Sequence, residues 1–221
     1  MQLIEELRAE HDLIERVVGS LRTFAALRAC HEADAADGPR FLRFFVHYAG
    51  HFHHAREEDT LFVSLARDAE LPADRGPLAV LLGDHRRMAG LLESMAPLLT
   101  SAGALDAEAG ARLQALATEY AHALWHHIDA ENSVLLPESE MRLRRHGVRE
   151  LPSRPMTDEE AEAYAWGGEL VARYPPASDA DAMRGDGCVM CPALLSDCRG
   201  LEHEWWNESE WDEFEDHLPS G

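Results

Sequence analysis

The sequence predicts an all-α protein, an up-down antiparallel four-helix bundle that is followed by a C-terminal helix and an irregular tail rich in Cys and Trp. Four long stretches within the first 147 residues repeat their apolar side chains with the period of an α-helix. Short turn-rich stretches separate them, at about 32–39, 72–77 and 100–106. No segment shows the alternating pattern of a strand. Apolar residues form 46% of the 221-residue chain, which is enough for a packed core.

The four bundle helices are expected at about 2–30, 39–68, 77–99 and 106–145. The last of them is expected to break near Pro137, because proline lacks the amide hydrogen that a helix interior uses. Long helices joined by short loops pack as antiparallel neighbours. We therefore predict a bundle domain over residues 1–147 and an appended segment over residues 148–221.

The appended segment begins as a linker that contains Pro152 and Pro155. Thr157 and Glu160 then have the spacing of a capping box, in which each side chain accepts a hydrogen bond from the backbone of the other residue. This pattern predicts a short helix that ends near Arg173, before a Pro-Pro pair.

The rest of the tail contains Cys188, Cys191 and Cys198, followed by His203. The spacing Cys-x2-Cys-x6-Cys-x4-His is compatible with a zinc site. A redox-active Cys-x-x-Cys pair and three incidental thiols are the alternatives. Residues 201–216 hold three Trp and one Phe among acidic residues, and exposed aromatic side chains would form an unusual apolar patch. We therefore expect the tail to dock on the bundle or on a protein partner.

The charge balance excludes some classes of partner. The chain has 20 basic and 41 acidic residues and a formal net charge of −21. Such a chain lacks the basic face that nucleic acid or an anionic membrane surface requires. The N-terminus has no apolar signal core, no run of 18 apolar residues occurs, and the cysteines indicate no disulfide framework in the first 150 residues. We expect a soluble cytoplasmic protein.

Polar side chains interrupt the apolar faces of three of the predicted helices. His11 lies at the centre of the apolar stripe of the first helix, and His85 lies at the centre of the stripe of the third. In the fourth helix, His127 and Glu131 lie one turn apart on the apolar face. A buried imidazole or carboxylate needs a partner, so these positions are candidates for a polar site.

The second helix contains two overlapping His-x-x-x-Glu pairs, His53/Glu57 and His54/Glu58. The face that runs through His53 is the more apolar one, which favours the first pair. Because this helix is apolar nearly all round, periodicity leaves the second pair as an alternative.

A single histidine on a core face is usually a hydrogen-bonded core residue. Here four helices each present one histidine, and two of them also present a glutamate, which would cost several kcal/mol to bury without a partner. A shared pair of cations would supply that partner, with two histidines on each ion, bridging glutamates and an open position for a small ligand. Imidazole and carboxylate ligands without thiolate suit Fe, Mn or Zn. The predicted metal ligands are His11, His53, Glu57, His85, His127 and Glu131.

Other histidines are not expected to be ligands. His122 and His126 fall on the polar face of the fourth helix. Glu119 and His122 form the chain's one Glu-x-x-His match, whereas a ferritin-like di-iron site needs this motif on two helices. Because the match also lies on the outer face, we exclude a ferritin-like site.

Four segments, in order along the chain, resemble the hemerythrin-like (HHE cation-binding) family of bacterial type. The resemblance covers about residues 1–145 and is carried by 10–12, 53–62, 76–85 and 127–137. It implies two non-haem iron ions that are bridged by an oxo or hydroxo group and by carboxylates. In the family, the first Glu of the pair before Leu61 and Phe62 is the ligand, which favours His53 and Glu57.

Two departures from the oxygen-carrying members bear on function. Ala89 stands where those proteins have a second histidine, and Glu131 lies four residues after His127 where they have an Asp five residues after. The pattern is closer to bacterial sensors and to proteins that repair iron centres under nitrosative stress. The latter have an extra histidine near the end of the first helix, where His31 stands in a turn-prone stretch. Whether His31 or His54 is an additional ligand stays open.

The expected function is the binding or sensing of a small molecule such as O2 or NO at the metal site. One alternative is a di-iron enzyme or iron donor in oxidative or nitrosative stress, which reduces peroxide or NO or repairs iron-sulfur clusters. The other alternative is metal storage. No core side chain beyond the ligands suggests a dedicated general acid or base.

Overall fold

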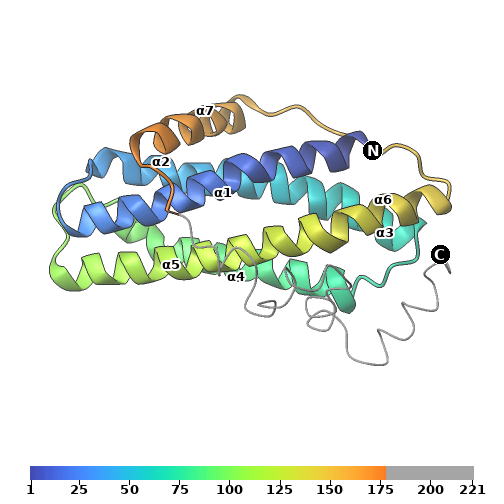
Figure 1. Cartoon of the computed structure of the whole chain (residues 1–221), viewed down its shortest axis with the longest axis horizontal. Helices are drawn as coiled ribbons and strands as arrows, with labels where there is room; N and C mark the ends of the chain where they lie inside the picture. Colours follow the sequence, from blue (N-terminus) through green and yellow to red (C-terminus); the bar gives the residue numbers. More distant parts are fainter. Residues whose placement is uncertain (178–221) are drawn as a thin grey trace, which may run out of the picture.

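The computed structural model describes residues 1–177, in which four long helical segments lie side by side along the longest axis (Figure 1). The predicted all-α bundle is confirmed, and no strand occurs among these residues. The first segment is α1 (Gln2–Ala29) and the third is α4 (Gly76–Leu99). The second segment consists of α2 (Gly38–Arg43), η2 (Phe44–His54), η3 (Glu57–Phe62) and α3 (Val63–Asp68), and a short helix, η1 (Ala35–Asp37), precedes it. The fourth consists of α5 (Ala107–Ala130), η4 (Glu131–Leu135) and α6 (Leu136–Arg145).

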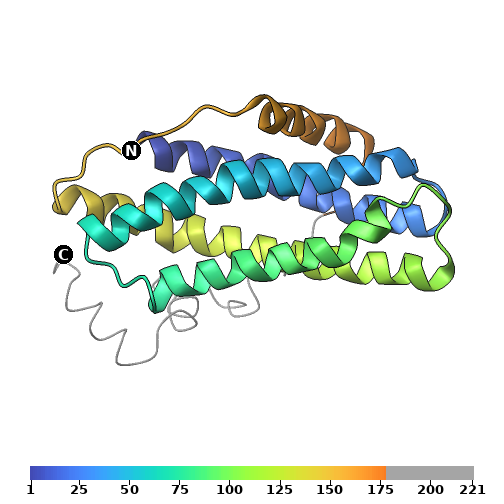
Figure 2. The same ribbon diagram turned by 180° about the vertical axis from the view of Figure 1, so that it is seen from behind.

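Neighbouring segments in the sequence pack against each other. The second segment runs beside α4, and α4 runs beside α5, as the view from behind shows (Figure 2). The fourth segment closes the bundle by packing against α1. The second segment starts close to the end of α4, where a Cβ atom at Gly38 would lie only 2.0 Å from the carbonyl oxygen of Leu99. Glycine is therefore required for this close approach.

The expected break at Pro137 is wrong, because the fourth segment stays helical through this residue. Pro137 lies in the first turn of α6, directly after η4. A proline inside a continuous helical segment leaves a carbonyl of the preceding turn without its donor, and that turn is η4, where the hydrogen-bond pattern already departs from that of an α-helix.

Three stretches, η2, η3 and η4, are π-helical, with hydrogen bonds from residue i to residue i+5. Such stretches are rare, and they are frequently found at functional sites. Those in this protein contain His53, Glu57 and Glu131, three of the predicted ligands. The regular α-helical pattern is thus interrupted where the predicted site lies.

The bundle has two apolar cores. One core contains Phe24, Phe45 and Trp125 and fills the half of the bundle near the loops at 30–38 and 100–106. The other contains Leu7 and Leu61 and fills the half near the N-terminus. A layer of buried polar side chains separates them. Water cannot solvate a polar layer between two apolar cores. The free-energy cost of burying these polar groups must therefore be offset by hydrogen bonds or by charges inside the protein.

The predicted capping box is confirmed, and it opens α7 (Asp158–Arg173). This helix lies over α1 and η2, outside the four-helix bundle (Figure 1). Gly167 allows close contact, since a Cβ atom there would lie 2.5 Å from the ring of Phe44. After the helix, the Tyr174 hydroxyl donates a hydrogen bond to buried Asp37 at 2.7 Å. The appended segment is therefore packed on the bundle as far as residue 177.

The zinc, redox and docking predictions for Cys188, Cys191, Cys198, His203 and the tryptophans of 201–216 lie outside the described residues. Within residues 1–177, none of the helices combines the length and the hydropathy that a membrane span requires.

Candidate metal centre

The structure brings all six predicted site residues together in the polar layer between the two cores. They come from α1, η2, η3, α4, α5 and η4, and none of them is more than 7% exposed. The side chains are His11, His53, Glu57, His85, His127 and Glu131.

The four histidines form two pairs whose Nε2 atoms converge. The Nε2 atoms of His11 and His53 are 3.0 Å apart, and those of His85 and His127 are also 3.0 Å apart. Each pair thus directs two ring nitrogens at one point, the arrangement in which two imidazoles share a metal ion.

The two glutamates lie between the pairs. The two oxygens of Glu131 lie 3.3 Å from His11 Nε2 and 3.4 Å from His127 Nε2. The two oxygens of Glu57 lie 3.3 Å from His53 Nε2 and 3.6 Å from His85 Nε2. Each carboxylate therefore faces both pairs with different oxygens, as a carboxylate that bridges two ions must.

The two buried glutamates of this layer lack a positively charged partner among the described residues. None of the four carboxylate oxygens of Glu57 and Glu131 has a hydrogen-bond partner among the described residues. Burial raises the pKa of both glutamates well above the usual value, and the nearby Glu131 raises the pKa of Glu57 further. Burial also lowers the pKa of His53, and it lowers the pKa of His127 to about 4. Burial thus favours neutral His53 and His127, and the carboxylates beside them have no partner, so the donor set fits cations bound between them.

His54 also belongs to the cluster, although the sequence favoured His53 in its place. The His54 ring stacks on the His85 ring, with centroids 4.0 Å apart. Ligand atoms lie within 4.8 Å of one another in two groups, and the groups are His11, His53, Glu57, Glu131 and His54, Glu57, His85, His127. A π-helix has more residues per turn than the ~3.6 of an α-helix, so consecutive side chains diverge less. His53 and His54 can therefore both face the site.

The structure does not bring His31, His122 or His126 into either group. His31 is exposed with a φ of 62°, and it follows α1, which extends about 27 Å beyond His11. His122 is exposed and His126 is half-buried. Their exclusion agrees with the polar face that the sequence predicts for them.

The family model of the hemerythrin HHE cation binding domain matches residues 2–139. The chain belongs to this family. The match covers both groups of candidate ligands. A search of curated proteins and a search of solved structures gave no significant match.

Each of the four predicted histidines of this HHE domain has an oxygen atom near the ring nitrogen that faces away from the site, and three of these nitrogens are hydrogen-bonded to it. Such partners fix the orientation of a ligand histidine and raise its basicity. The hydrogen-bonded pairs are His11 Nδ1 with Asn132 Oδ1 (2.9 Å), His53 Nδ1 with Glu10 Oε2 (2.8 Å) and His85 Nδ1 with Glu58 Oε1 (2.6 Å). His127 Nδ1 lies 3.5 Å from Asp84 Oδ2 without a hydrogen bond. None of these partners was predicted from the sequence.

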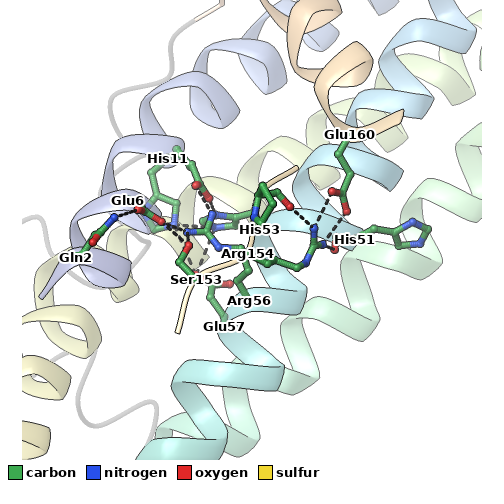
Figure 3. A network of polar contacts seen from close by, with 12 residues as sticks. Gln2, Glu6, His11, His51, His53, Arg56, Glu57, Ser153, Arg154 and Glu160 are labelled. Atoms are coloured by element: carbon green, nitrogen blue, oxygen red, sulfur yellow. Dashed lines mark hydrogen bonds and ion pairs between the residues drawn. The ribbon is translucent and has the colours of Figure 1, made fainter. Parts of the chain in front are cut away.

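One of these partners, Glu10, connects the HHE domain to the appended segment through Arg56, which lies beside Ser153 (Figure 3). Glu10 accepts a hydrogen bond from Arg56, whose guanidinium also donates to Glu6 at 2.5 Å and to Ser153 at 3.3 Å. Ser153 lies beyond residue 139, where the family match ends. A continuous chain of polar contacts thus runs from His53 to the linker before α7.

An apolar pocket of about 410 Å³ opens beside the site. His54 and His85 line it together with apolar side chains of the second segment and of α4, among them Val46, Ala89 and Leu92. Ala89 is exposed, so this position marks the solvent side of the pocket. The HHE domain therefore offers a path from solvent to the ligand cluster.

Proposed function

We propose that this protein binds two iron ions in its polar layer, and that this di-iron centre takes up a small molecule such as O2 or NO. The observation that carries the proposal is the set of four buried oxygens of Glu57 and Glu131, which lie between two pairs of histidines without hydrogen-bond partners among residues 1–177. Two uncompensated carboxylates would cost several kcal/mol. A pair of bound cations offsets that cost.

Each proposed ion has its own histidines, and both ions share the two carboxylates. His11 and His53 would bind one ion, His54, His85 and His127 would bind the other, and Glu57 would bind both. Glu131 would bind both as well, since its two oxygens face His11 and His127. Imidazole and carboxylate without thiolate suit iron, manganese or zinc, and the family resemblance selects iron. Bound iron supplies redox chemistry and coordination positions for a small ligand.

The protein's own groups hold and shield this centre. Glu10, Glu58 and Asn132 orient the histidines from behind, which leaves their Nε2 atoms directed at the ions. The apolar pocket admits a small molecule beside His54 and His85. This access favours ligand binding over storage.

Metal analysis of single variants tests the metal assignment. We expect wild type to hold about two iron ions per chain, and Glu57→Ala and Glu131→Ala to lose most of them, because each change removes a ligand of both ions. The control is the double variant His122→Gln/His126→Gln, which should keep the wild-type content. Full retention of iron in both glutamate variants would overturn the assignment.

Stopped-flow absorption of the reduced protein, mixed in turn with O2, NO and peroxide, tests the ligand. A reversible spectral change that saturates at one equivalent of O2 or NO supports the proposal. Consumption of peroxide or NO over many turnovers would show an enzyme instead. Absence of any spectral response would indicate metal storage.

A further inference from the structure

The pocket beside the candidate metal centre is larger than a diatomic molecule needs. Its volume of about 410 Å³ compares with ~30 Å³ for one molecule of liquid water. It lies within the range of ~300–1,000 Å³ that is typical of pockets for small organic ligands. Entry of O2 or NO alone does not account for a space of this size.

The pocket is elongated and mostly apolar. It follows α4 from His85 to Ala96, eleven residues that span about 16 Å of helix. Its walls include Leu42 and Val46 on one side and Leu92 on the other. Such walls favour a hydrocarbon body, because burying it removes apolar surface from water.

One polar group that lines the pocket has no hydrogen-bond partner among residues 1–177. Tyr120 lines the pocket, and its hydroxyl makes no hydrogen bond with the other described residues and is not one of the fully enclosed side-chain atoms. Its recorded interaction is the edge contact of its ring with Phe45. This hydroxyl is therefore a donor that an oxygen atom of a ligand in the pocket can accept a hydrogen bond from.

The charges around the pocket disfavour an anionic ligand. Glu93 is exposed at the rim, and Glu58 lies beside His85. The whole chain carries a formal charge of −21. A neutral molecule enters such a field without repulsion.

We propose that this pocket binds a neutral, elongated organic molecule with a hydrocarbon body and an oxygen function that accepts a hydrogen bond from Tyr120. The molecule belongs to the class of alcohols, carbonyl compounds and hydroperoxides. This inference rests on the proposed function, since the ligand would occupy the access path to the di-iron centre and lie against His54 and His85. The proposal names a class of organic compound that would bind next to the di-iron centre, in addition to diatomic gases.

Isothermal titration calorimetry of the full-length, iron-loaded protein with 1-octanol tests the inference. We expect one binding site, and at least tenfold weaker binding in Ala89→Phe, which narrows the pocket from its solvent side. Ala111→Phe, at an exposed position of α5 outside the pocket, should bind as wild type does. Tyr120→Phe should weaken binding about three- to tenfold through loss of one hydrogen bond. Octanoate should bind more weakly than octanol because of its charge.

Absence of octanol binding, or equal binding by wild type and Ala89→Phe, overturns the inference. Octanoate binding as tight as that of octanol overturns the assignment of a neutral ligand. Iron content and the spectral response to NO are measured on the same samples. If these stay intact while octanol fails to bind, the further inference is wrong and the proposed function still stands. Loss of iron in the wild-type sample would instead contradict the proposed function.

Discussion

The oxygen partners of the four histidines follow a simple pattern in the sequence. Glu10 precedes His11 but contacts His53 on the neighbouring segment, and Asn132 follows Glu131 but contacts His11. A residue next to a core-facing position is turned by about 100°, toward the adjacent helix. Each ligand motif therefore also provides the support for a histidine on another helix.

At the same scale, Glu10→Gln should lower metal affinity about ten- to hundredfold. The amide keeps a hydrogen-bond acceptor near His53 but loses the charge that Glu10 presents to the ring and to Arg56. Competition with a chelator of known affinity measures the change. Asp12→Asn, an exposed change two residues away, is the control and should have no effect. Equal affinities for Glu10→Gln and wild type would show that the contact does not tune the site.

His54 provides a second prediction at this scale. We expect His54→Ala to reduce the iron content from about two ions toward one, because this histidine belongs to only one of the two ligand groups. The neighbouring exposed residue allows a matched control, His51→Ala, which should keep both ions. Wild-type iron content in His54→Ala would remove this residue from the ligand set.

At the scale of elements, α7 is attached to the bundle through polar contacts at its start. The guanidinium of Arg154 donates two hydrogen bonds of 2.7 Å to the Glu160 carboxylate, and it also donates to the carbonyl oxygen of His51 at 2.6 Å (Figure 3). These hydrogen bonds from Arg154, together with those of the capping box, lower the pKa of Glu160 to about 2. The linker and α7 are thereby tied to η2, which carries two of the candidate ligands.

Glu160→Gln should therefore destabilise the protein by about 1–2 kcal/mol at pH 7, or roughly 2–8 °C in melting temperature. The pKa of Glu160 is lower in the folded state than the usual 4.5, so its contribution is present above pH 4.5 and is lost as the pH falls toward 2. The difference between variant and wild type should shrink across that window in thermal melts. Glu162→Gln, at an exposed position of α7, is the control. A difference that stays constant with pH would contradict the assigned ion pair.

At the scale of the whole molecule, the bundle consists of two apolar cores joined through a polar layer. The cores supply the apolar burial that stabilises the fold, whereas the buried glutamates of the layer oppose folding when no cation is bound. Metal binding and folding are therefore coupled. The chain should be least stable when the site is stripped.

Removal of metal by a chelator should lower the melting temperature by roughly 5–10 °C, if the metal is otherwise present at about 100 times its Kd.

Glu57→Gln should reverse the order of melting temperatures between variant and wild type when the metal is removed. It should melt lower than wild type with iron, because a ligand is lost, and higher than wild type without iron, because a buried carboxyl group is replaced by a neutral amide.

The pH dependence of the metal-free proteins checks this reversal. The pKa of Glu57 is raised on folding, so its contribution to stability is present below pH 4.5 and is lost as the pH rises through the folded value. The advantage of metal-free Glu57→Gln should therefore grow from pH 4.5 to pH 7. Glu108→Gln, an exposed change on α5, should show no such trend. A metal-free variant that melts below metal-free wild type at pH 7 would contradict this account.

The sequence by itself determined the bundle, its loops, the capping box and the six core-facing side chains. These features depend on local rules, namely the helical period of apolar residues and the residues that begin and end helices. His11 and His127 could be identified because a polar residue in an apolar stripe stands out in any regular helix.

Only the tertiary structure decided the features that depend on irregular backbone or on contacts between helices. His54 joins the cluster because η2 is π-helical. A sequence pattern based on the α-helical period of ~3.6 residues does not predict that His53 and His54 face the same site. The partners Glu10 and Glu58 lie on other helices than the histidines they contact, so only the packing of the helices decides which histidine each one supports. Pro137 leaves the segment helical, since its missing N–H falls next to η4, where the hydrogen bonds are already π-helical. The helical period of the sequence shows on which face of a regular helix a residue lies. The packing of the helices decides which residues of other helices it contacts.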